Sequence, residues 1–251
     1  MLMSMLALSI KVLQTVKTLL FPYTCPLCAK PLDETAGCCA TCLQSIHTIP
    51  HHTCQSCGVP LHPSLAPGPC GQCLKKPLPQ QQTHHLYLYK TVVRHAILTW
   101  KLQGQDAGLN FLLQAAAPKL KHIFSENDLL LPVPMPLYRM RRSGLHHSAD
   151  LCLKISSIVG CQTDTTLLRR TGNHTRQSTL QGKARHTNLR QAFMLHSPSF
   201  HHLYPLKNKG KIWVIDDILT TGATLRHACG VVARLKQPVF AFSFARAWHD
   251  R

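Results

Sequence analysis

The chain has 251 residues, enough for one large domain or for one ordinary domain with a small appendage. A hydrophobic content of 45% against 15% charged residues is typical of globular proteins and excludes a wholly disordered chain. Lysine and arginine number 28 against 10 acidic residues, so the formal net charge is +18. This excess predicts an anionic partner or substrate, such as a nucleic acid, a phosphate-rich metabolite or a membrane surface.

Residues 1–21 are rich in apolar side chains, which a signal peptide, a membrane-surface helix or a helix packed on the protein itself could explain. Polar residues recur there at helical spacing, at Ser4, Lys11, Thr15 and Thr18. No basic region precedes the apolar run, and no small-residue cleavage site follows it. We therefore expect an amphipathic helix. No other stretch approaches 18 apolar residues, so we expect a cytoplasmic protein that meets the membrane only through partners.

A cysteine-rich module covers residues 22–76. Eight of its cysteines form four successive pairs with two residues between the members: Cys25 and Cys28, Cys39 and Cys42, Cys54 and Cys57, and Cys70 and Cys73. Two thiolates at that spacing present two corners of a tetrahedron to one Zn2+, and a second pair supplies the other two. We predict a double zinc ribbon with two structural Zn2+ ions. Because a closed four-thiolate site has no position for water, we expect these ions to serve folding and docking and not catalysis.

Alternatives to this zinc assignment are a disulfide cluster and a thioredoxin-like redox pair. The clustering argues against a disulfide lattice, and the redox pair needs a single Cys-x-x-Cys at the start of a helix in a βαβ unit. The four pairs could be used in sequence, or in a cross-braced arrangement that joins the first pair with the third. Cys38 is a spare thiol that could substitute for Cys39.

A stretch rich in proline and glutamine, residues 77–85, predicts a linker. Beyond it, residues 86–251 alternate between strand and helix patterns. We expect strands at 86–89, 129–133, 212–215 and 239–245, and helices at about 92–100, 109–120, 148–159 and 223–235. Such alternation predicts an α/β domain with a parallel sheet flanked by helices.

Two adjacent acids, Asp216 and Asp217, follow the predicted strand at 212–215 and precede a turn rich in hydroxyls and glycine. Amide groups at the start of the next helix, with the hydroxyls of residues 220, 221 and 224, can cradle a phosphate, and Gly222 lets the backbone approach it. The two acids would repel a bare phosphate. They can instead accept hydrogen bonds from the sugar hydroxyls of a ribose 5-phosphate. The alternative is a strand-to-helix junction in which Asp or Thr only caps the helix.

The pattern Asp-Asp-x-x-Thr-Thr-Gly-x-Thr at 216–224 is similar to the phosphoribosyl pyrophosphate (PRPP) signature of type I phosphoribosyltransferases. With four cysteine pairs ahead of it, the chain resembles the ComF family of competence-associated proteins over nearly its whole length. The resemblance implies a type I phosphoribosyltransferase-like sheet and Mg2+ bound with PRPP. It also implies that Asp216 and Asp217 are the catalytic pair on the ribose hydroxyls. The implied PRPP-binding set is Asp216, Asp217, Ile218, Leu219, Thr220, Thr221, Gly222, Ala223 and Thr224.

The same resemblance places Pro134, Arg139, Arg176 and Arg185 at the pyrophosphate and in the flexible catalytic loop. One departure concerns residues 144–147, where the family usually has Gly-Phe-Asn-Gln and this chain has Gly-Leu-His-His. The paired histidines of the chain lack metal-ligand spacing, and we expect most of them at the surface.

Ten lysines or arginines stand against two acids between positions 138 and 190. They could form a solvated basic surface, neutralise a pyrophosphate or follow a nucleic-acid backbone. Aromatic residues free to stack on bases are few, so we expect no sequence-specific readout. The candidate DNA contacts are Arg139, Arg141, Arg142, Lys183 and Arg185.

Two functions stay open. The resemblance and the basic residues favour a protein that binds PRPP and handles incoming single-stranded DNA in natural transformation. Its partners would include a DNA-translocating helicase or a recombination mediator at the cytoplasmic face of the membrane. The alternative is an active phosphoribosyltransferase that transfers the ribosyl group of PRPP to a base or amine. The absence of a recognisable base-specificity segment favours the first.

Overall fold

The computed structural model describes residues 23–32, 37–171, 192–196 and 210–248. The predicted helix at 1–21 lies outside the described residues. So do Arg176, Lys183 and Arg185, which the sequence assigns to the flexible loop and to DNA binding.

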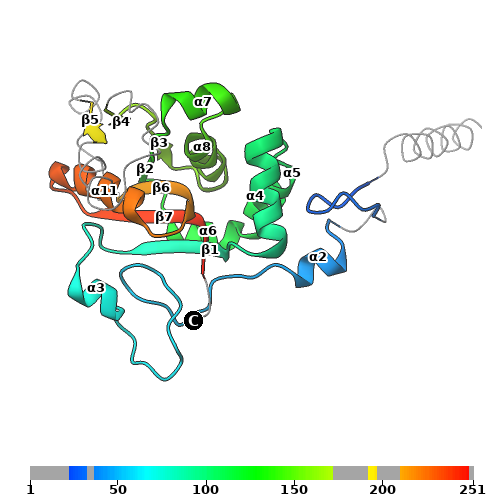
Figure 1. The fold of residues 1–251 in the computed structure, drawn as a ribbon, viewed down its shortest axis with the longest axis horizontal. Coiled ribbons are helices and arrows are strands. Elements are labelled where there is room, and N and C mark those ends of the chain that lie inside the picture. The colour runs from blue at the N-terminus through cyan, green and yellow to red at the C-terminus, as the bar shows by residue number, and fades with distance from the viewer. Residues whose placement is uncertain (1–22, 33–36, 172–191, 197–209, 249–251) are drawn as a thin grey trace, which may run out of the picture.

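A five-stranded parallel sheet forms the centre of the fold, as predicted (Figure 1). All four pairings within it are parallel, and its central strands are apolar on both faces because helices cover both sides. A separate antiparallel pair joins β4 (Leu168–Arg170) to β5 (Phe193–Leu195). The sheet order is β1-β7-β6-β2-β3, with β1 Thr83–Leu88, β2 Leu129–Pro132, β3 Gln162–Thr163, β6 Ile212–Leu219 and β7 Val239–Arg246.

Side chains alternate along the strands, so the sheet divides the core into two apolar clusters. Trp213 and Ile215 of β6 pack in the cluster that includes Trp100, whereas Ile212 and Val214 pack in the other. The first cluster holds α4 (Thr91–Gln103), α5 (Ala107–Ala115), α6 (Ala117–Ile123) and α8 (His147–Val159), and the second holds α11 (Ala223–Val232). A short 3-10 turn, η1 (Ala233–Leu235), follows α11.

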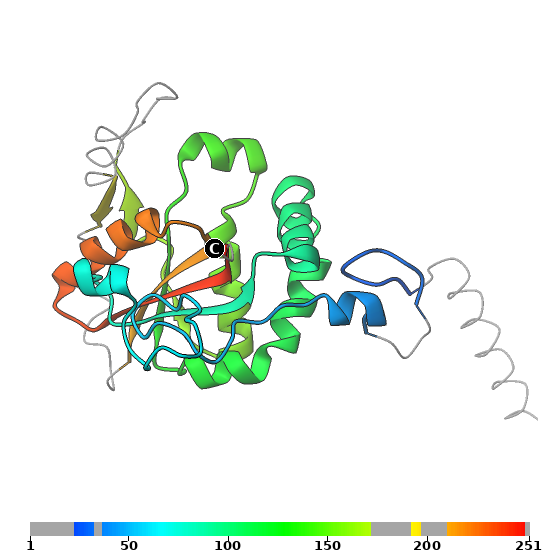
Figure 2. The same ribbon diagram turned by 60° about the horizontal axis from the view of Figure 1, so that its bottom comes forward.

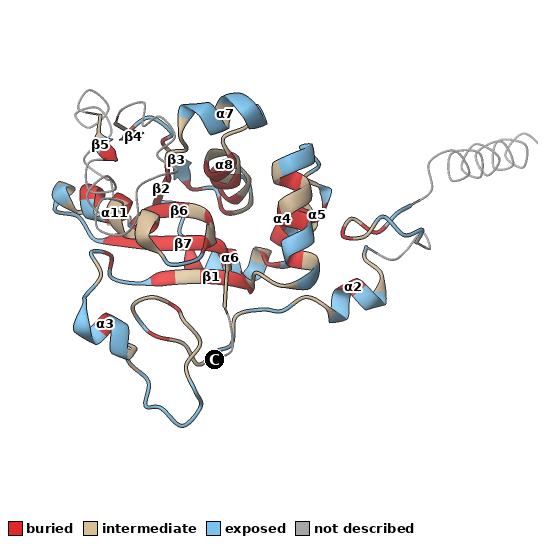
Figure 3. Cartoon of the chain, in the orientation of Figure 1, coloured by how far each residue is buried: buried red, intermediate tan, exposed pale blue. Residues whose placement is uncertain are grey.

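One helix stands outside these layers. The helix α7 (Leu137–Ser143) has no buried residue and projects beside α8 (Figure 3). The sequence shows basic residues at 139, 141 and 142, and no helix was predicted there. Gly144 ends α7 in the left-handed conformation, with φ +69°.

The two ribbons of the zinc module contact different parts of the sheet domain (Figure 2). The first ribbon, with α2 (Ala40–Gln44), packs on α5, where a Cβ at Gly108 would lie 2.9 Å from the Pro26 carbonyl oxygen. The second, with α3 (Gly71–Lys75), lies against β1 and β7. Between them, Thr48 forms an antiparallel bridge with Tyr87 and covers the free edge of β1.

Three predicted boundaries differ from the structure. The strand β1 begins at Thr83, inside the predicted linker 77–85, because Thr83 to His85 continue the ladder with β7. The strand β6 runs to Leu219 and includes both acids, since Asp216 pairs with Ser243 and the ladder reaches Arg246. The predicted helix at 109–120 is two helices, α5 and α6, because Pro118 lacks the amide hydrogen that a continuous helix needs.

Candidate functional site

Two loops leave the sheet in opposite directions at the carboxyl ends of β2 and β6. After β6 the chain returns through α11 as β7, and after β2 it returns through α7 and α8, on the other face, as β3. Ligands of open α/β sheets bind at such a switch point. The amide of Val133, just after β2, donates to the Ile215 carbonyl at 2.9 Å. The predicted pyrophosphate residue Pro134 and the predicted ribose acids are therefore neighbours.

The two acids lie at the end of β6 with different surroundings. Asp217 is 8% exposed, and its Oδ2 lies 2.5 Å from Lys101 Nζ of α4. Its Oδ1 accepts the Ile218 amide at 2.6 Å. Asp216 is half-buried, and its Oδ1 accepts the Asp217 amide at 2.9 Å and the Ser148 hydroxyl at 3.3 Å. One acid is thus ion-paired and the other is held by neutral donors.

This difference appears in the protonation of Asp216. Burial, followed by the charge of Asp217, raises the pKa of Asp216 to about 7, although the Asp217 amide, Lys101 and Ser148 oppose the rise. A carboxyl with a pKa near 7 exchanges its proton at physiological pH, so it can serve as an acid or as a base.

The loop after β6 encloses a small cavity of about 40 Å3. The cavity is lined by Asp216 and by residues 218–225, which include all of the residues that the sequence predicts for a ribose 5-phosphate except Asp217. Gly222 is the N-cap of α11 with φ +73°, a conformation that a residue with a Cβ rarely adopts. Thr220 and Thr221 are exposed, and the Thr221 hydroxyl accepts the Ala223 amide at 3.5 Å. Free amides and hydroxyls at a helix start can bind an anion.

Exposed basic residues stand at the same edge of the sheet. Arg139, Arg141 and Arg142 are exposed on α7, and the Arg139 guanidinium lies 5.9 Å from the Tyr138 ring centroid. Burial lowers the pKa of Arg170 in β4, and the charge of Arg139 lowers it further. The antiparallel pair β4–β5 therefore adds positive charge beside α7.

The two histidines at 146 and 147 take structural positions at the start of α8. The Nδ1 of His146 accepts the Ala149 amide as the N-cap of α8, and Nε2 lies 3.1 Å from the Met135 amide. A neutral imidazole has one acceptor nitrogen, so His146 satisfies one amide at a time. Burial lowers its pKa and keeps the ring neutral. His147 is buried and packs edge-to-face on Trp100, with ring centroids 5.0 Å apart.

The cysteine module forms two tetrads from consecutive pairs, which decides against the cross-braced alternative. The sulfur atoms of each tetrad lie within 4.8 Å of one another. Sulfurs about 3.8 Å apart are expected around a Zn2+ with bonds of about 2.3 Å. The Cys28–Cys39 and Cys57–Cys70 sulfur distances are 3.7 and 3.9 Å. The tetrads, Cys25, Cys28, Cys39, Cys42 and Cys54, Cys57, Cys70, Cys73, thus fit two structural zinc ions.

Backbone amides support the first thiolate of each tetrad. Burial raises the pKa of Cys25, but backbone hydrogen bonds lower it to about 6. The Cys54 sulfur accepts the Cys70 amide at 3.1 Å, and hydrogen bonds of this kind lower its pKa to about 7 against the effect of burial. Cys38 lies 3.7 Å from the Cys25 sulfur, yet burial raises its pKa to about 12. Cys39, not the spare thiol, completes the first tetrad.

A buried polar cluster ties the second tetrad to the sheet. His85, a member of a histidine pair expected at the surface, is 4% exposed between the Ser243 hydroxyl at 2.7 Å and the Cys57 carbonyl at 3.0 Å. Arg246, near the end of β7, donates to the same carbonyl at 3.2 Å. A Cβ at Gly58 would lie 2.6 Å from the His85 ring. The ribbon and the sheet therefore meet through close, specific contacts.

Two residues of the acid site were missed by sequence reasoning. Lys101 follows the buried Trp100 on α4, and Ser148 lies in the first turn of α8. In the sequence, Lys101 directly follows the predicted helix at about 92–100 and Ser148 begins the predicted helix at 148–159, and neither position points to the acids. Only the packing of α4 and α8 against β6 reveals that they reach Asp216 and Asp217.

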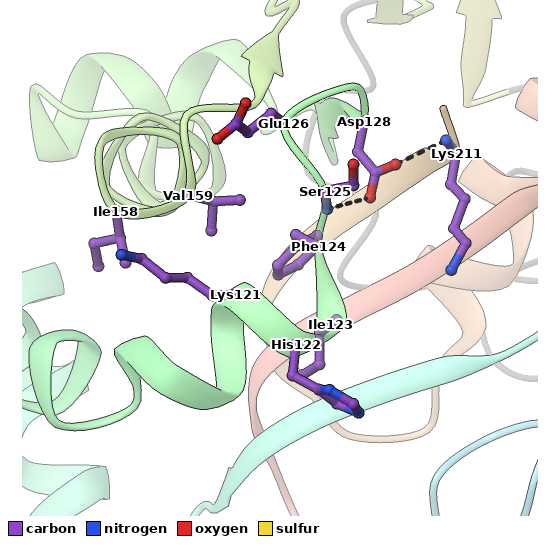
Figure 4. Close-up of a pocket in the computed structure, with 10 residues that line it drawn as sticks. All are labelled: Lys121, His122, Ile123, Phe124, Ser125, Glu126, Asp128, Ile158, Val159 and Lys211. Carbon is purple, nitrogen blue, oxygen red and sulfur yellow. Dashed lines mark hydrogen bonds between the residues drawn. The ribbon is translucent and has the colours of Figure 1, made fainter. Parts of the chain in front are cut away.

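A larger cavity, of about 490 Å3, opens at the opposite edge, where β2 and β6 begin (Figure 4). One of its two acidic residues, Asp128, is buried, and its carboxylate accepts from the Ser125 amide, the Lys211 amide and the Trp213 indole. Among the side chains that line it and that the structure describes, no buried polar atom lacks a hydrogen-bond partner. This cavity lies at the amino edge of the sheet, away from the switch point.

Comparison with known proteins agrees with the cysteine module. The family model described as "Double zinc ribbon domain" matches residues 16–74. The "DNA utilization protein YhgH" of Escherichia coli (strain K12) is 29% identical over 220 residues, which cover 85% of this chain and 92% of that protein. The "Competence protein F" of Haemophilus influenzae is 26% identical over 217 residues, covering 84% and 91%. Within the described residues, no helix combines the length and apolarity that a membrane crossing requires.

Proposed function

We propose that this chain, which is similar to the ComF family of competence-associated proteins, binds PRPP and handles single-stranded DNA during DNA uptake. The names of its relatives support the broader role in DNA uptake. The PRPP site is the loop at 216–224, and the DNA surface is the exposed basic helix α7. The observation that carries the proposal is the meeting of an acid pair, a small cavity at a helix start and α7 at one switch point.

The ribose 5-phosphate part of the ligand matches the donors and acceptors of this edge. The 5-phosphate fits the amides and hydroxyls of residues 220–224, at the start of a helix of ten residues. The ribose hydroxyls are hydrogen-bond donors, and Asp216 and Asp217 supply acceptors next to that cavity. Mg2+ would be bound together with the pyrophosphate, for which the loop after β2 and the exposed side chain of Arg139 are the proposed contacts.

Single-stranded DNA suits α7 because the helix buries none of its side chains. Three arginines there are free to contact phosphates, and such contacts bind DNA without reading its sequence. Tyr138 is 54% exposed and offers one stacking surface for a base. The helix α7 follows the loop after β2 closely in the sequence, so we expect DNA bound to α7 to change the affinity for PRPP, and PRPP to change the affinity for DNA.

The test is a calorimetric titration of PRPP with Mg2+ into the wild type and into the double variant Asp216→Asn, Asp217→Asn. We expect the variant to bind at least about tenfold more weakly, because an asparagine side chain carries no charge and has one acceptor oxygen where aspartate has two. Asp106→Asn is the matched control, because Asp106 is also ion-paired, to Lys154 at 2.5 Å, but lies outside the cavity. This control should retain wild-type affinity.

A folded wild type that does not bind PRPP would contradict the proposal, as would equal affinity in the wild type and the double variant. Repeating the titration with a saturating single-stranded oligonucleotide tests the connection between the two ligands. A shift in PRPP affinity must be matched by an equal shift in DNA affinity with PRPP present, because binding free energies are reciprocal.

A second candidate function is phosphoribosyl transfer from PRPP to a base or amine. The pKa of about 7 at Asp216 favours it, because such a carboxyl can take a proton from an attacking amine. Release of pyrophosphate in the presence of candidate acceptors would reveal turnover. Binding without any release would leave ligand sensing as the role of the site.

A further inference from the structure

We propose that Lys101 belongs to the PRPP site, as the counter-charge that allows two carboxylates to stand beside a phosphate cavity. The inference rests on the proposed function, because it assigns a new residue to the same site. It answers a difficulty visible in the sequence: an acid pair next to a phosphate cradle repels the phosphate unless something neutralises it.

The position of Lys101 is set by its neighbour in α4. Trp100 is 1% exposed, and its indole donates to Asp150 Oδ2 of α8 at 3.0 Å. The same ring packs edge-to-face on His147 of α8. These contacts lock α4 against α8 and direct the next side chain, Lys101, to the end of β6, where its ammonium lies 2.5 Å from Asp217.

The ion pair is partly sheltered from water. The side chain of Lys101 is 23% exposed and that of Asp217 is 12% exposed. Solvent screens such a pair less than it screens a surface ion pair. Among the described residues, Lys101 is the basic group within ion-pair distance of either acid. Its charge therefore offsets the carboxylate of Asp217, the residue between Asp216 and Ile218, both of which line the cavity.

At low pH a proton on Asp216 removes one negative charge from the acid pair, in addition to the charge that Lys101 offsets at Asp217, and this gives the proposal a specific dependence on pH. Asp216 takes up a proton near neutrality, and Lys101 holds that proton affinity down. The other titratable groups that face the pair come from α8: His146, His147 and Cys152. A phosphate monoester loses its second proton at about pH 6, so the ligand carries its full negative charge at pH 8 and less at pH 5.5. Loss of the Lys101 charge therefore weakens binding more at pH 8, where Asp216 is also mostly ionised, than at pH 5.5.

The experiment measures the affinity for ribose 5-phosphate and for PRPP with Mg2+ at pH 5.5 and pH 8, in wild type, Lys101→Met and Lys101→Arg. We expect Lys101→Met to bind at least tenfold more weakly at pH 8 and within threefold of wild type at pH 5.5. Lys101→Arg keeps the charge and should stay within threefold at both pH values. Lys154→Met is the matched control, because Lys154 makes an ion pair of the same length, with Asp106. It should change affinity less than twofold.

Equal affinity of Lys101→Met and wild type at pH 8 would overturn the inference while the PRPP site stands. A loss of the same size at both pH values would also overturn it, because that result is expected of a purely structural role. The inference would also be overturned if Lys101→Arg bound as weakly as Lys101→Met at pH 8. Failure of the wild type to bind either ligand at any pH would instead overturn the proposed function itself. Thermal unfolding of each variant in the same buffers confirms that the measured protein is folded.

Discussion

Asp216 is a candidate-site residue whose protonation differs strongly from that of an ordinary aspartate. Its carboxyl lies between the amide of its ion-paired neighbour Asp217 and the hydroxyl of Ser148, so only neutral donors contact it directly. Burial then makes the ionised form costly, and its pKa rises to about 7. Asp217 has a different partner, because Lys101 makes an ion pair with it.

This raised pKa predicts how stability depends on pH. An acid whose pKa is higher in the folded than in the unfolded state binds more protons when folded, so its contribution to stability falls as pH rises between the two pKa values. Here that window runs from about 4 to about 7. The slope is at most that of one proton, about 1.4 kcal/mol per pH unit. Above this window the contribution is constant.

We expect Asp216→Asn to remove that slope. The free energy of unfolding of wild type minus that of the variant, from urea titrations at pH 4 to 8, should decrease up to about pH 7 and then level off. His146 and His147 have lowered pKa values and titrate in the opposite sense, but they are present in both proteins and largely cancel in the difference. A difference that is constant from pH 4 to 8 would contradict the prediction.

At the scale of elements, α7 is a helix that the core does not require. It contains no buried residue, and its arginines are exposed. Substitutions on such a surface usually change stability by less than about 0.5 kcal/mol. Any functional effect of these arginines can therefore be measured without a large effect on folding.

We expect Arg141→Ala combined with Arg142→Ala to weaken single-stranded DNA binding and to reduce its salt dependence. Each lost phosphate contact lowers the slope of log affinity against log salt by about 0.7, so two contacts lower it by about 1.4. The measurement is fluorescence anisotropy of a labelled oligonucleotide at several salt concentrations.

The matched control is Lys121→Ala with Arg234→Ala, which removes two exposed positive charges from elements outside the candidate site. If both double variants lowered the slope equally, net charge and not α7 would account for the binding. An unchanged slope in the α7 variant would remove this helix from the DNA surface.

At the scale of the whole molecule, the zinc module and the sheet domain share one packed structure. Cys25, Leu27 and Cys42 of the first ribbon belong to the same apolar cluster as the helices on one face of the sheet. The second ribbon meets β1 and β7 through His85 and Arg246. A metal that organises the ribbons therefore also stabilises the sheet domain.

We expect Cys54→Ser to reduce the zinc content from two ions per chain to one and to lower stability by at least about 2 kcal/mol. PRPP affinity of the folded fraction should stay within threefold of wild type, since the Cys54 tetrad lies apart from the residues that line the cavity at 216–225. Elemental analysis, urea unfolding and calorimetry give the three values.

Cys38→Ser is the control for that variant, because Cys38 lies beside the first tetrad but is not part of it. It should retain two zinc ions and wild-type stability. Loss of PRPP binding in a Cys54→Ser protein that remains folded would instead make the second ribbon part of the ligand site.

Features with a local cause were predictable from the sequence. The spacing of the cysteine pairs sets which sulfurs can share one metal, and a buried apolar run followed by two acids and a Gly-Thr turn specifies a strand, a loop and a helix start. Both predictions hold in the structure, at Cys25 to Cys73 and at 212–225. Boundaries were less accurate, because β1 and β6 are extended by pairing with β7, a strand far along the chain.

The sequence by itself determined the two metal tetrads as candidates, the parallel α/β sheet and the acid-rich loop after β6. Only the tertiary structure decided that consecutive cysteine pairs are used together, that Lys101 neutralises Asp217 and that His85 and Arg246 join the second ribbon to the sheet. The physical reason is range: spacing and turn chemistry act within a few residues, whereas these contacts bring together side chains separated by 11 to 189 positions.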